Sequence, residues 1–157
     1  MLIRRATEED CAGILGCLAS AFAAYQERYT PEAFLDTILT PNSILSRLEE
    51  MTVFVAVHGS GDVIGTISCK VETGGGGHLR GMAVRPEWQG SPVANELLAR
   101  AEQYFQEAGC LAITLDTTQP LKRAMRFYVK HGFRSTGRVI DSFGMPLFEY
   151  RKPIVRK

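Results

Sequence analysis

The sequence predicts an α+β domain in three layers, with a mixed, mostly antiparallel central sheet flanked by helices on both faces. Two β-rich runs, 53–57 and 63–68, are separated by a short polar turn, which is typical of a hairpin. An amphipathic helical pattern over 93–105 leads into a nearly continuous apolar run at 111–115, which predicts a strand, helix and strand crossover. Helical patterns also lie before and after these runs, so both faces of the sheet can be covered.

The first fifty residues predict an edge strand and then helices. Residues 2–6 alternate enough for an edge strand, and Thr7 with Asp10 three positions later resembles a helix N-cap arrangement. Pro31 opens a second helical pattern that Pro41 interrupts, so two short helices are expected there. The apolar positions that define the two patterns are Ile14, Leu15, Leu18 and Phe22, then Phe34, Leu35, Ile38 and Leu39.

The middle of the chain predicts a third strand after a glycine-rich connection. The four glycines at 74–77 are expected to form a flexible connection, because no P-loop Lys-Ser or Lys-Thr follows them. The run 78–84 is the third strand, and Pro86 ends it.

The last third predicts two helices and three strands. The first helix ends at Gly109 and the strand 111–115 follows it. A second helix is expected from Pro120 to Gly132, followed by strands at 133–139 and 147–151. The inward positions of the two helices are Val93, Leu97, Leu98, Ala101 and Phe105, then Leu121, Ala124, Met125 and Tyr128.

The bulk properties favour one intracellular domain covering 1–157. A chain of 157 residues can bury a continuous core, and a formal charge of +1 gives no electrostatic basis for binding nucleic acid or a membrane. No run is long enough to cross a bilayer, and the charged start lacks a signal peptide. The four cysteines form no metal-binding pattern, so no metal is expected, and reduced thiols in a cytoplasmic compartment are the simpler interpretation.

The segment 82–98 is predicted to be a strand, a tight turn and a helix start. Such a turn exposes the first amides of the helix, whose unpaired donors and positive dipole end suit a phosphate group. An anionic cofactor could therefore bind to a nearly neutral protein.

This segment resembles motif A of the GNAT acetyltransferases, Gln/Arg-x-x-Gly-x-Gly/Ala, with Gln89 and Ala94 in the outer positions. Downstream, Ala124, Phe127-Tyr128 and Gly132-Phe133 resemble the C-terminal signature of that family. The resemblance implies that acetyl-CoA is the acyl donor and that its pantetheine arm pairs with the strand Met82, Ala83 and Val84. It also implies that the pyrophosphate binds at the turn and takes the amides that are present among Gln89, Gly90, Ser91, Pro92, Val93 and Ala94.

Two positions depart from the family pattern. Pro92 stands where glycine is usual, and it has no N–H to offer to a phosphate, although proline suits the first turn of a helix. Leu121 stands where many relatives carry an asparagine that touches the cofactor. Thr117, Thr118 or Gln119 are the candidates to compensate for it.

Acyl transfer to an amine needs a neutral amine, a donor for the developing oxyanion and a proton for the leaving thiolate. The resemblance implies Tyr128 as the general acid, whereas its place on an apolar helical stripe is also compatible with a core tyrosine. For the general base the candidates are His78, Glu72, Glu27 and water.

The expected acceptor is a primary amine of a small molecule or peptide, bound between 25–29 and the loop 141–145, which are the positions that such proteins vary to change substrate. Ordinary loops are the alternative interpretation of both segments. A homodimer is common in the superfamily and is a possible assembly. The alternatives to catalysis are a catalytically silent acyl-CoA-binding regulatory domain and a structural domain without a CoA site.

Overall fold

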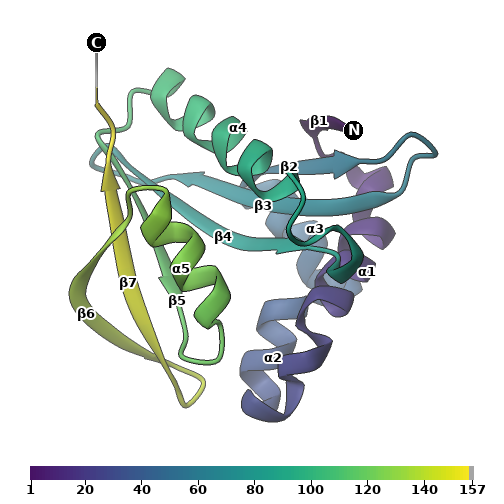
Figure 1. Cartoon of the computed structure of the whole chain (residues 1–157), viewed down its shortest axis with the longest axis horizontal. Helices are drawn as coiled ribbons and strands as arrows, with labels where there is room; N and C mark the ends of the chain where they lie inside the picture. Colours follow the sequence, from purple (N-terminus) through teal and green to yellow (C-terminus); the bar gives the residue numbers. More distant parts are fainter. Residues whose placement is uncertain (156–157) are drawn as a thin grey trace.

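The computed structural model describes residues 1–155, and one seven-stranded sheet runs through it in the order β1-β2-β3-β4-β5-β7-β6 (Figure 1). Neighbouring strands are antiparallel except β4 and β5, which are parallel. This confirms the predicted mixed, mostly antiparallel sheet. The strands are β1 Leu2–Arg5, β2 Thr52–Val57, β3 Val63–Val71, β4 Gly76–Val84, β5 Ala112–Thr117, β6 Arg134–Ser142 and β7 Met145–Pro153.

Helices cover both faces of the sheet, as predicted. In Figure 1, α4 and α5 lie in front of the strands, α1 and α3 lie behind them, and α2 lies below them. Each face has its own apolar core: α4 and Tyr128 of α5 pack on one, and α1, α2 and α3 pack on the other. The helices are α1 Cys11–Phe22, α2 Pro31–Ile38, α3 Pro41–Glu50, α4 Val93–Glu107 and α5 Lys122–Lys130, with 3-10 turns η1 Glu8–Asp10, η2 Ala23–Arg28 and η3 Pro86–Trp88.

Local signals set the start of α2 and α3. Thr30 and Thr40 are the N-caps, and their side chains accept from the amides of Ala33 and Ser43. Pro31 and Pro41 each occupy the first helical position, where the missing N–H costs nothing. The predicted interruption at Pro41 is therefore confirmed. The predicted N-cap arrangement of Thr7 and Asp10 is also present, at the start of η1, with the amide of Thr7 donating to Asp10 at 2.8 Å.

The prediction that 74–77 forms a flexible connection is wrong for its second half. Gly74 and Gly75 make the turn with positive φ, but Gly76 and Gly77 belong to β4. Gly77 is required by packing, because a Cβ there would lie 2.5 Å from the ring of the fully buried Phe105 in α4.

Other boundaries shift by a few residues. The polar, aromatic segment 25–29, expected to be a loop, lies mostly in η2. The second C-terminal helix begins at Lys122 rather than Pro120, and β6 and β7 both extend to form a long hairpin. Among residues 1–155, no helix combines the length and apolar character needed to cross a membrane.

Candidate active site

The sheet opens between β4 and β5. Their parallel pairing joins only 76–79 to 112–115, although β4 continues to Val84 and β5 to Thr117. Beyond Leu79 the two strands diverge, as Figure 1 shows. The backbone of β4 from Arg80 to Val84 therefore faces an opening in the sheet rather than another strand.

A bulge at Gly81 reshapes the open part of β4. The register with β3 shifts so that Gly81 and Met82 lie opposite one residue, Ile67. Gly81 has φ of 59°, which favours glycine, and the guanidinium of the buried Arg47 lies against it. The bulge places Met82 on the α5 side of the sheet, where it packs against that core.

The predicted turn follows β4 through η3 and ends at α4. Gly90 takes a positive φ of 83°, and Pro92 is the N-cap of α4. The amides of Gln89 and Ser91 donate within the turn, to Pro86 and Trp88. Among the described residues, no acceptor takes the amides of Gly90, Ala94 or Asn95, so these N–H groups are available to a ligand.

Arg123 of α5 reaches across the opening to this turn. Its Nη1 donates to Oε1 of Gln89 at 3.3 Å, while Nε2 of Gln89 donates to the Val84 carbonyl at 3.1 Å. The nearest atom to a Cβ built on Gly90 would be Nη2 of Arg123, at 3.7 Å. Sequence reasoning missed Arg123, although four cations without an acidic residue in one nine-residue helix are a detectable signal.

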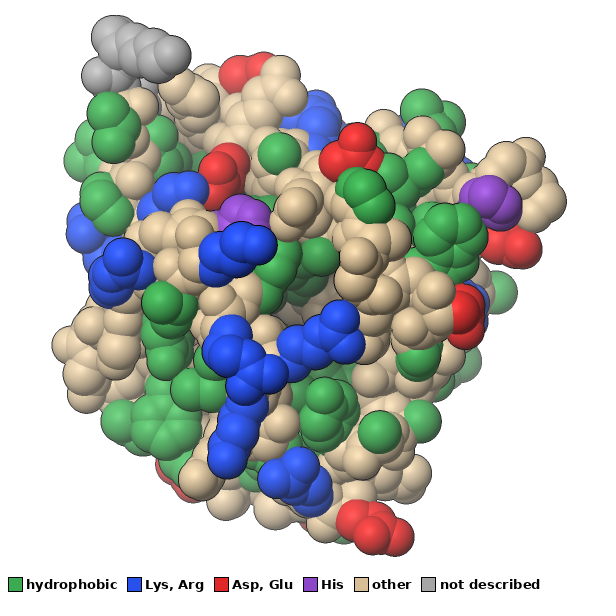
Figure 2. All heavy atoms as spheres, in the orientation of Figure 1, with side chains coloured by type: hydrophobic (Ala, Val, Ile, Leu, Met, Phe, Trp, Pro, Cys, Tyr) green, Lys and Arg blue, Asp and Glu red, His purple; other side chains and the backbone are tan. Residues whose placement is uncertain are grey.

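The cations of α5 form an exposed basic surface. They are Lys122, Arg123, Arg126 and Lys130. Figure 2 shows basic side chains gathered over α5, beside a hollow in the middle of that face. The local charge therefore favours an anionic ligand, even though the whole chain is nearly neutral.

Tyr128 links α5 to the open part of β4. Its side chain comes from α5 and is 8% exposed, and its hydroxyl donates to the sulfur of Met82 at 3.2 Å. Burial raises the pKa of this phenol well above its ordinary value, so the hydroxyl keeps its proton at neutral pH. A thioether is a weak acceptor, so the proton can be redirected to a better one.

Thr117 ends β5 with a hydroxyl that has no partner. The residue is 3% exposed, and its Oγ1 makes no hydrogen bond to any described residue. By contrast, Thr118 donates to the Pro146 carbonyl at 3.1 Å. Leu121 packs against the core behind the sheet. Gln119 is exposed and its side chain also makes no hydrogen bond among the described residues, so Thr117 is distinguished by having an unused polar group that is buried.

The three side chains considered as general base lie in different places. Glu72 is exposed in the turn before β4, at the opposite end of that strand from Val84. Glu27 is exposed in η2. His78 lies in the paired part of β4, where Nδ1 is 2.8 Å from Oγ1 of Thr114 and Nε2 is 3.6 Å from a carboxylate oxygen of Asp116. The structure does not bring the three together.

Burial makes His78 a pH-sensitive part of the fold. Burial lowers the pKa of its imidazole and outweighs the opposing effect of Asp116. As the pH falls below the ordinary histidine pKa of 6.5, the unfolded chain takes up a proton that the folded protein resists. We therefore expect the melting temperature to fall between pH 7.5 and 5.5, and to fall less in His78→Gln. The exposed His58→Gln is the control, and an equal drop in both variants would contradict this prediction.

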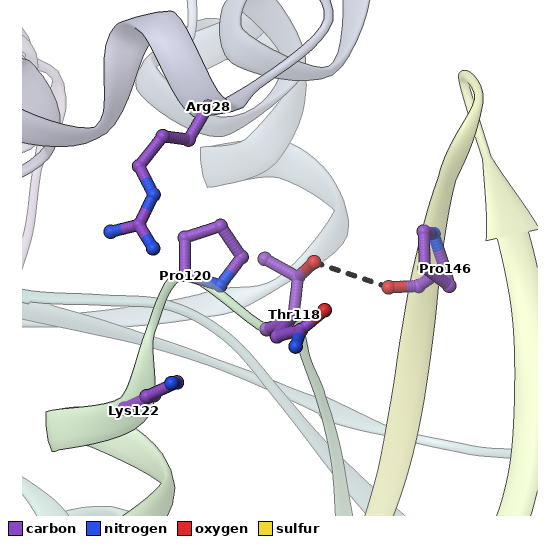
Figure 3. Close-up of a pocket in the computed structure, with 6 residues that line it drawn as sticks. Arg28, Thr118, Pro120, Lys122 and Pro146 are labelled. Atoms are coloured by element: carbon purple, nitrogen blue, oxygen red, sulfur yellow. Dashed lines mark hydrogen bonds between the residues drawn. The ribbon is translucent and has the colours of Figure 1, made fainter.

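A pocket lies where the two predicted acceptor segments meet. The hydroxyl of Thr30, just after η2, donates to the Phe143 carbonyl in the β6–β7 turn at 2.7 Å. Next to this contact is a cavity of about 280 Å³ (Figure 3), lined by Arg28, Thr118, Gln119, Pro120, Lys122 and Pro146. Arg28 falls within the predicted segment, and Pro146 adjoins the other one. Tyr29 instead packs against Phe22 and Phe34, and burial raises its pKa to about 12.

The described residues include no candidate metal centre. Within 1–155, no three His, Cys, Asp or Glu side chains are grouped so that they could hold an ion. Three of the four cysteines, Cys17, Cys69 and Cys110, are buried, and burial raises the pKa of Cys17 to about 11 and that of Cys69 to about 12. These thiols therefore behave as small apolar side chains rather than nucleophiles.

The mixed sheet opens between two parallel strands, free helix amides follow one of them, and a buried phenol contacts it, which is an arrangement that can hold an extended, phosphate-bearing acyl carrier. The comparison with known families agrees, because the model of the acetyltransferase (GNAT) family matches residues 14–133. The chain belongs to the GNAT acetyltransferase family.

Two relatives are acetyltransferases with different acceptors. The aminoglycoside N(6')-acetyltransferase type 1 of Stenotrophomonas maltophilia is 32% identical over 106 residues, covering 62% of this chain and 69% of the relative. The N-alpha-acetyltransferase MAK3 of Arabidopsis thaliana is 30% identical over 103 residues, covering 62% of this chain and 54% of the relative. The chain thus spans about half the length of the plant protein.

The fold agrees with a solved structure over nearly the whole chain. The PaiA N-acetyltransferase of Thermoplasma acidophilum, in complex with coenzyme A, superposes with a TM-score of 0.79 and 21% identity, covering 98% of both chains. At this identity the likeness concerns the fold.

Proposed function

We propose that the chain transfers an acetyl group from acetyl-CoA to a primary amine of a small molecule or peptide, by direct attack of the amine on the thioester. The observation that carries the proposal is the open section of β4, which is followed by free helix amides and contacted by the hydroxyl of Tyr128. Acetyl-CoA carries an amide-bearing arm and a pyrophosphate in one molecule, so it can use both features. The matched family supports this choice of donor.

The donor would use both arms of the opening. The edge of β4 at Met82, Ala83 and Val84, which no strand pairs on this side, would pair with the pantetheine arm, and the arm would share or displace the Gln89 side chain at the Val84 carbonyl. The amides of Gly90 and Ala94 would receive the pyrophosphate. Arg123 adds a cation beside Gly90. The unused hydroxyl of Thr117 would take a pantetheine amide in place of the missing asparagine.

The chemistry then needs one proton donor and one oxyanion donor. The amine nitrogen forms a bond to the thioester carbon, backbone N–H groups near Met82 to Val84 stabilise the oxyanion, and the carbon–sulfur bond breaks. The thiolate takes the proton of Tyr128, which is protonated at neutral pH because burial raises its pKa. The phenolate then recovers a proton from the one that the amine gives up through water. With Glu72 remote and His78 held by Thr114, water is the base that we favour for the amine.

Thiol release tests the proposal. Purified protein, acetyl-CoA and a panel of primary amines should release free CoA in proportion to the amide formed. Thermal stabilisation by acetyl-CoA without thiol release on any amine would instead support a catalytically silent, acyl-CoA-binding regulatory domain, and would contradict the proposed transfer. A cytoplasmic location and a homodimer stay predictions.

Pro92 is expected to weaken the donor site. Replacing Pro92 with alanine or glycine restores an N–H at the start of α4, where φ of −66° suits either residue. A hydrogen bond to a charged group contributes about 1.5–3 kcal/mol, so we expect the Kd for CoA to fall roughly tenfold. Isothermal titration calorimetry measures this. Pro41→Ala, the same change at the first position of α3, is the control, and equal affinity of all variants would show that this N–H does not meet the phosphate.

A further inference from the structure

The cavity beside the β6–β7 turn has the size of a small-molecule subsite. Its volume of about 280 Å³ is close to the lower limit of roughly 300 Å³ for ligand pockets. Three separate segments form its walls: η2, the connection from β5 to α5, and the start of β7. The hydrogen bond from Thr118 to the Pro146 carbonyl fixes one wall (Figure 3).

The lining of this cavity is positively charged. Arg28 extends from η2 toward Pro120, and Lys122 approaches from the first turn of α5 (Figure 3). None of the six lining residues is acidic. Neither cation forms an ion pair with any residue in the described part of the chain. The two charges are therefore available to something outside the protein.

The start of α5 adds to this positive potential. α5 has nine residues, and no side chain caps its first turn. The amides of Lys122, Arg123 and Ala124 find no acceptor among residues 1–155. The positive end of the helix dipole thus lies at the wall of a cavity that already holds two unpaired cations. These three features favour an oxyanion and disfavour a cation.

We infer that the acceptor is a small primary amine that also carries a carboxylate or a phosphate, and that Arg28 and Lys122 bind this anionic group. The inference rests on the proposed transfer, because it assigns the cavity to the acceptor of that reaction. The anionic group would lie in the cavity while the amine points toward the opening between β4 and β5. Arg28 and Lys122 are then specificity residues, and the proton transfer is left to other groups.

The acceptor class differs from the one named for the bacterial relative. Aminoglycosides carry several ammonium groups, and two cations without a carboxylate partner repel them. A relative 32% identical over 62% of the chain can share the donor half while the acceptor half differs.

Matched amines test the inference directly. We compare β-alanine with β-alaninamide and O-phosphoethanolamine with ethanolamine, and include kanamycin and spermidine as polycations, following thiol release from acetyl-CoA. We expect a higher kcat/KM for at least one anionic member of these pairs than for its neutral partner and for both polycations. The carboxylate and phosphate arms separate the two forms of anionic group.

Variants that remove one charge test whether Arg28 and Lys122 cause the preference for an anionic amine. Arg28→Gln and Lys122→Gln should each raise the KM for the preferred anionic amine about tenfold, which is typical of losing one charge-assisted hydrogen bond. They should raise the KM for the neutral partner much less. Arg5→Gln removes one exposed charge from the edge strand β1, away from the opening, so it is the control and should change neither KM.

The failures are distinguishable. Neutral amines or polycations preferred over both anionic amines would overturn the inference and leave the acetyltransferase proposal intact. An equal effect of the variants on charged and neutral amines would likewise overturn the inference alone. Absence of acetyl-CoA binding in a thermal-shift assay would overturn both.

Discussion

Tyr128→Phe is expected to lower kcat about 100-fold with acetyl-CoA and any productive amine, the lower end of the range for general acid catalysis. The substitution removes the hydroxyl that would give its proton to the leaving thiolate. In the structure this hydroxyl lies at the open part of β4, where it donates to the Met82 sulfur. The KM for acetyl-CoA should change little, since the ring and its packing remain. Steady-state kinetics of thiol release provides both constants.

The fold should tolerate this change. A phenol that donates to a thioether contributes little to stability, so the melting temperature of Tyr128→Phe should stay close to that of the parent. Tyr150→Phe removes the hydroxyl of a partly buried tyrosine that packs against the same core, and it serves as the matched control for activity. If Tyr128→Phe releases thiol as fast as the parent, Tyr128 is a core residue and the assigned acid is wrong.

Gly77→Ala is expected to give the largest loss of stability among the substitutions considered. The new Cβ would lie 2.5 to 2.8 Å from three ring atoms of Phe105, which is fully buried and cannot swing into solvent. Overpacking of this kind costs about 3 kcal/mol, because either α4 or β4 must move. For a chain of this length we expect the melting temperature to fall by roughly 6 to 12 °C.

The neighbouring glycine provides the control. Gly76 lies in the same strand, and a Cβ there would meet no atom within 4 Å. Gly76→Ala should therefore keep the melting temperature of the parent or raise it slightly. Equal losses in both variants would mean that backbone conformation, rather than contact with Phe105, determines the need for glycine here.

Much of the fold follows from hydrophobic periodicity and from the positions of glycine and proline. The β2–β3 hairpin, the α4 stripe and the break before Pro41 were predictable because each depends on residues close in sequence. The same patterns failed at Gly77, where the reason for glycine is the ring of Phe105, far away in the chain. From the sequence alone, a run of glycines in a flexible turn cannot be distinguished from one in a tightly packed strand.

The site divides in the same way. Two features, the turn from Gln89 to Ala94 and the residue Tyr128, belong to local motifs, so they could be predicted from the sequence. Arg123 could not be placed there, because its contact with Gln89 exists only once α5 lies across the opening. The bulge at Gly81 leaves no sequence signal beyond one glycine, and it depends on pairing with β3. The cavity at Arg28 and Lys122 joins segments that are distant in the sequence.

Four residue pairs are all that join β4 to β5, so a bound thioester would act as a temporary strand between two half-sheets. Binding of the thioester would make the sheet more rigid, and release of CoA would expose the unpaired edge of β4 again. The rate of turnover would then depend on local opening of the sheet. The chemical step would take place while β4 and β5 are held together by the donor, and CoA would leave when they separate.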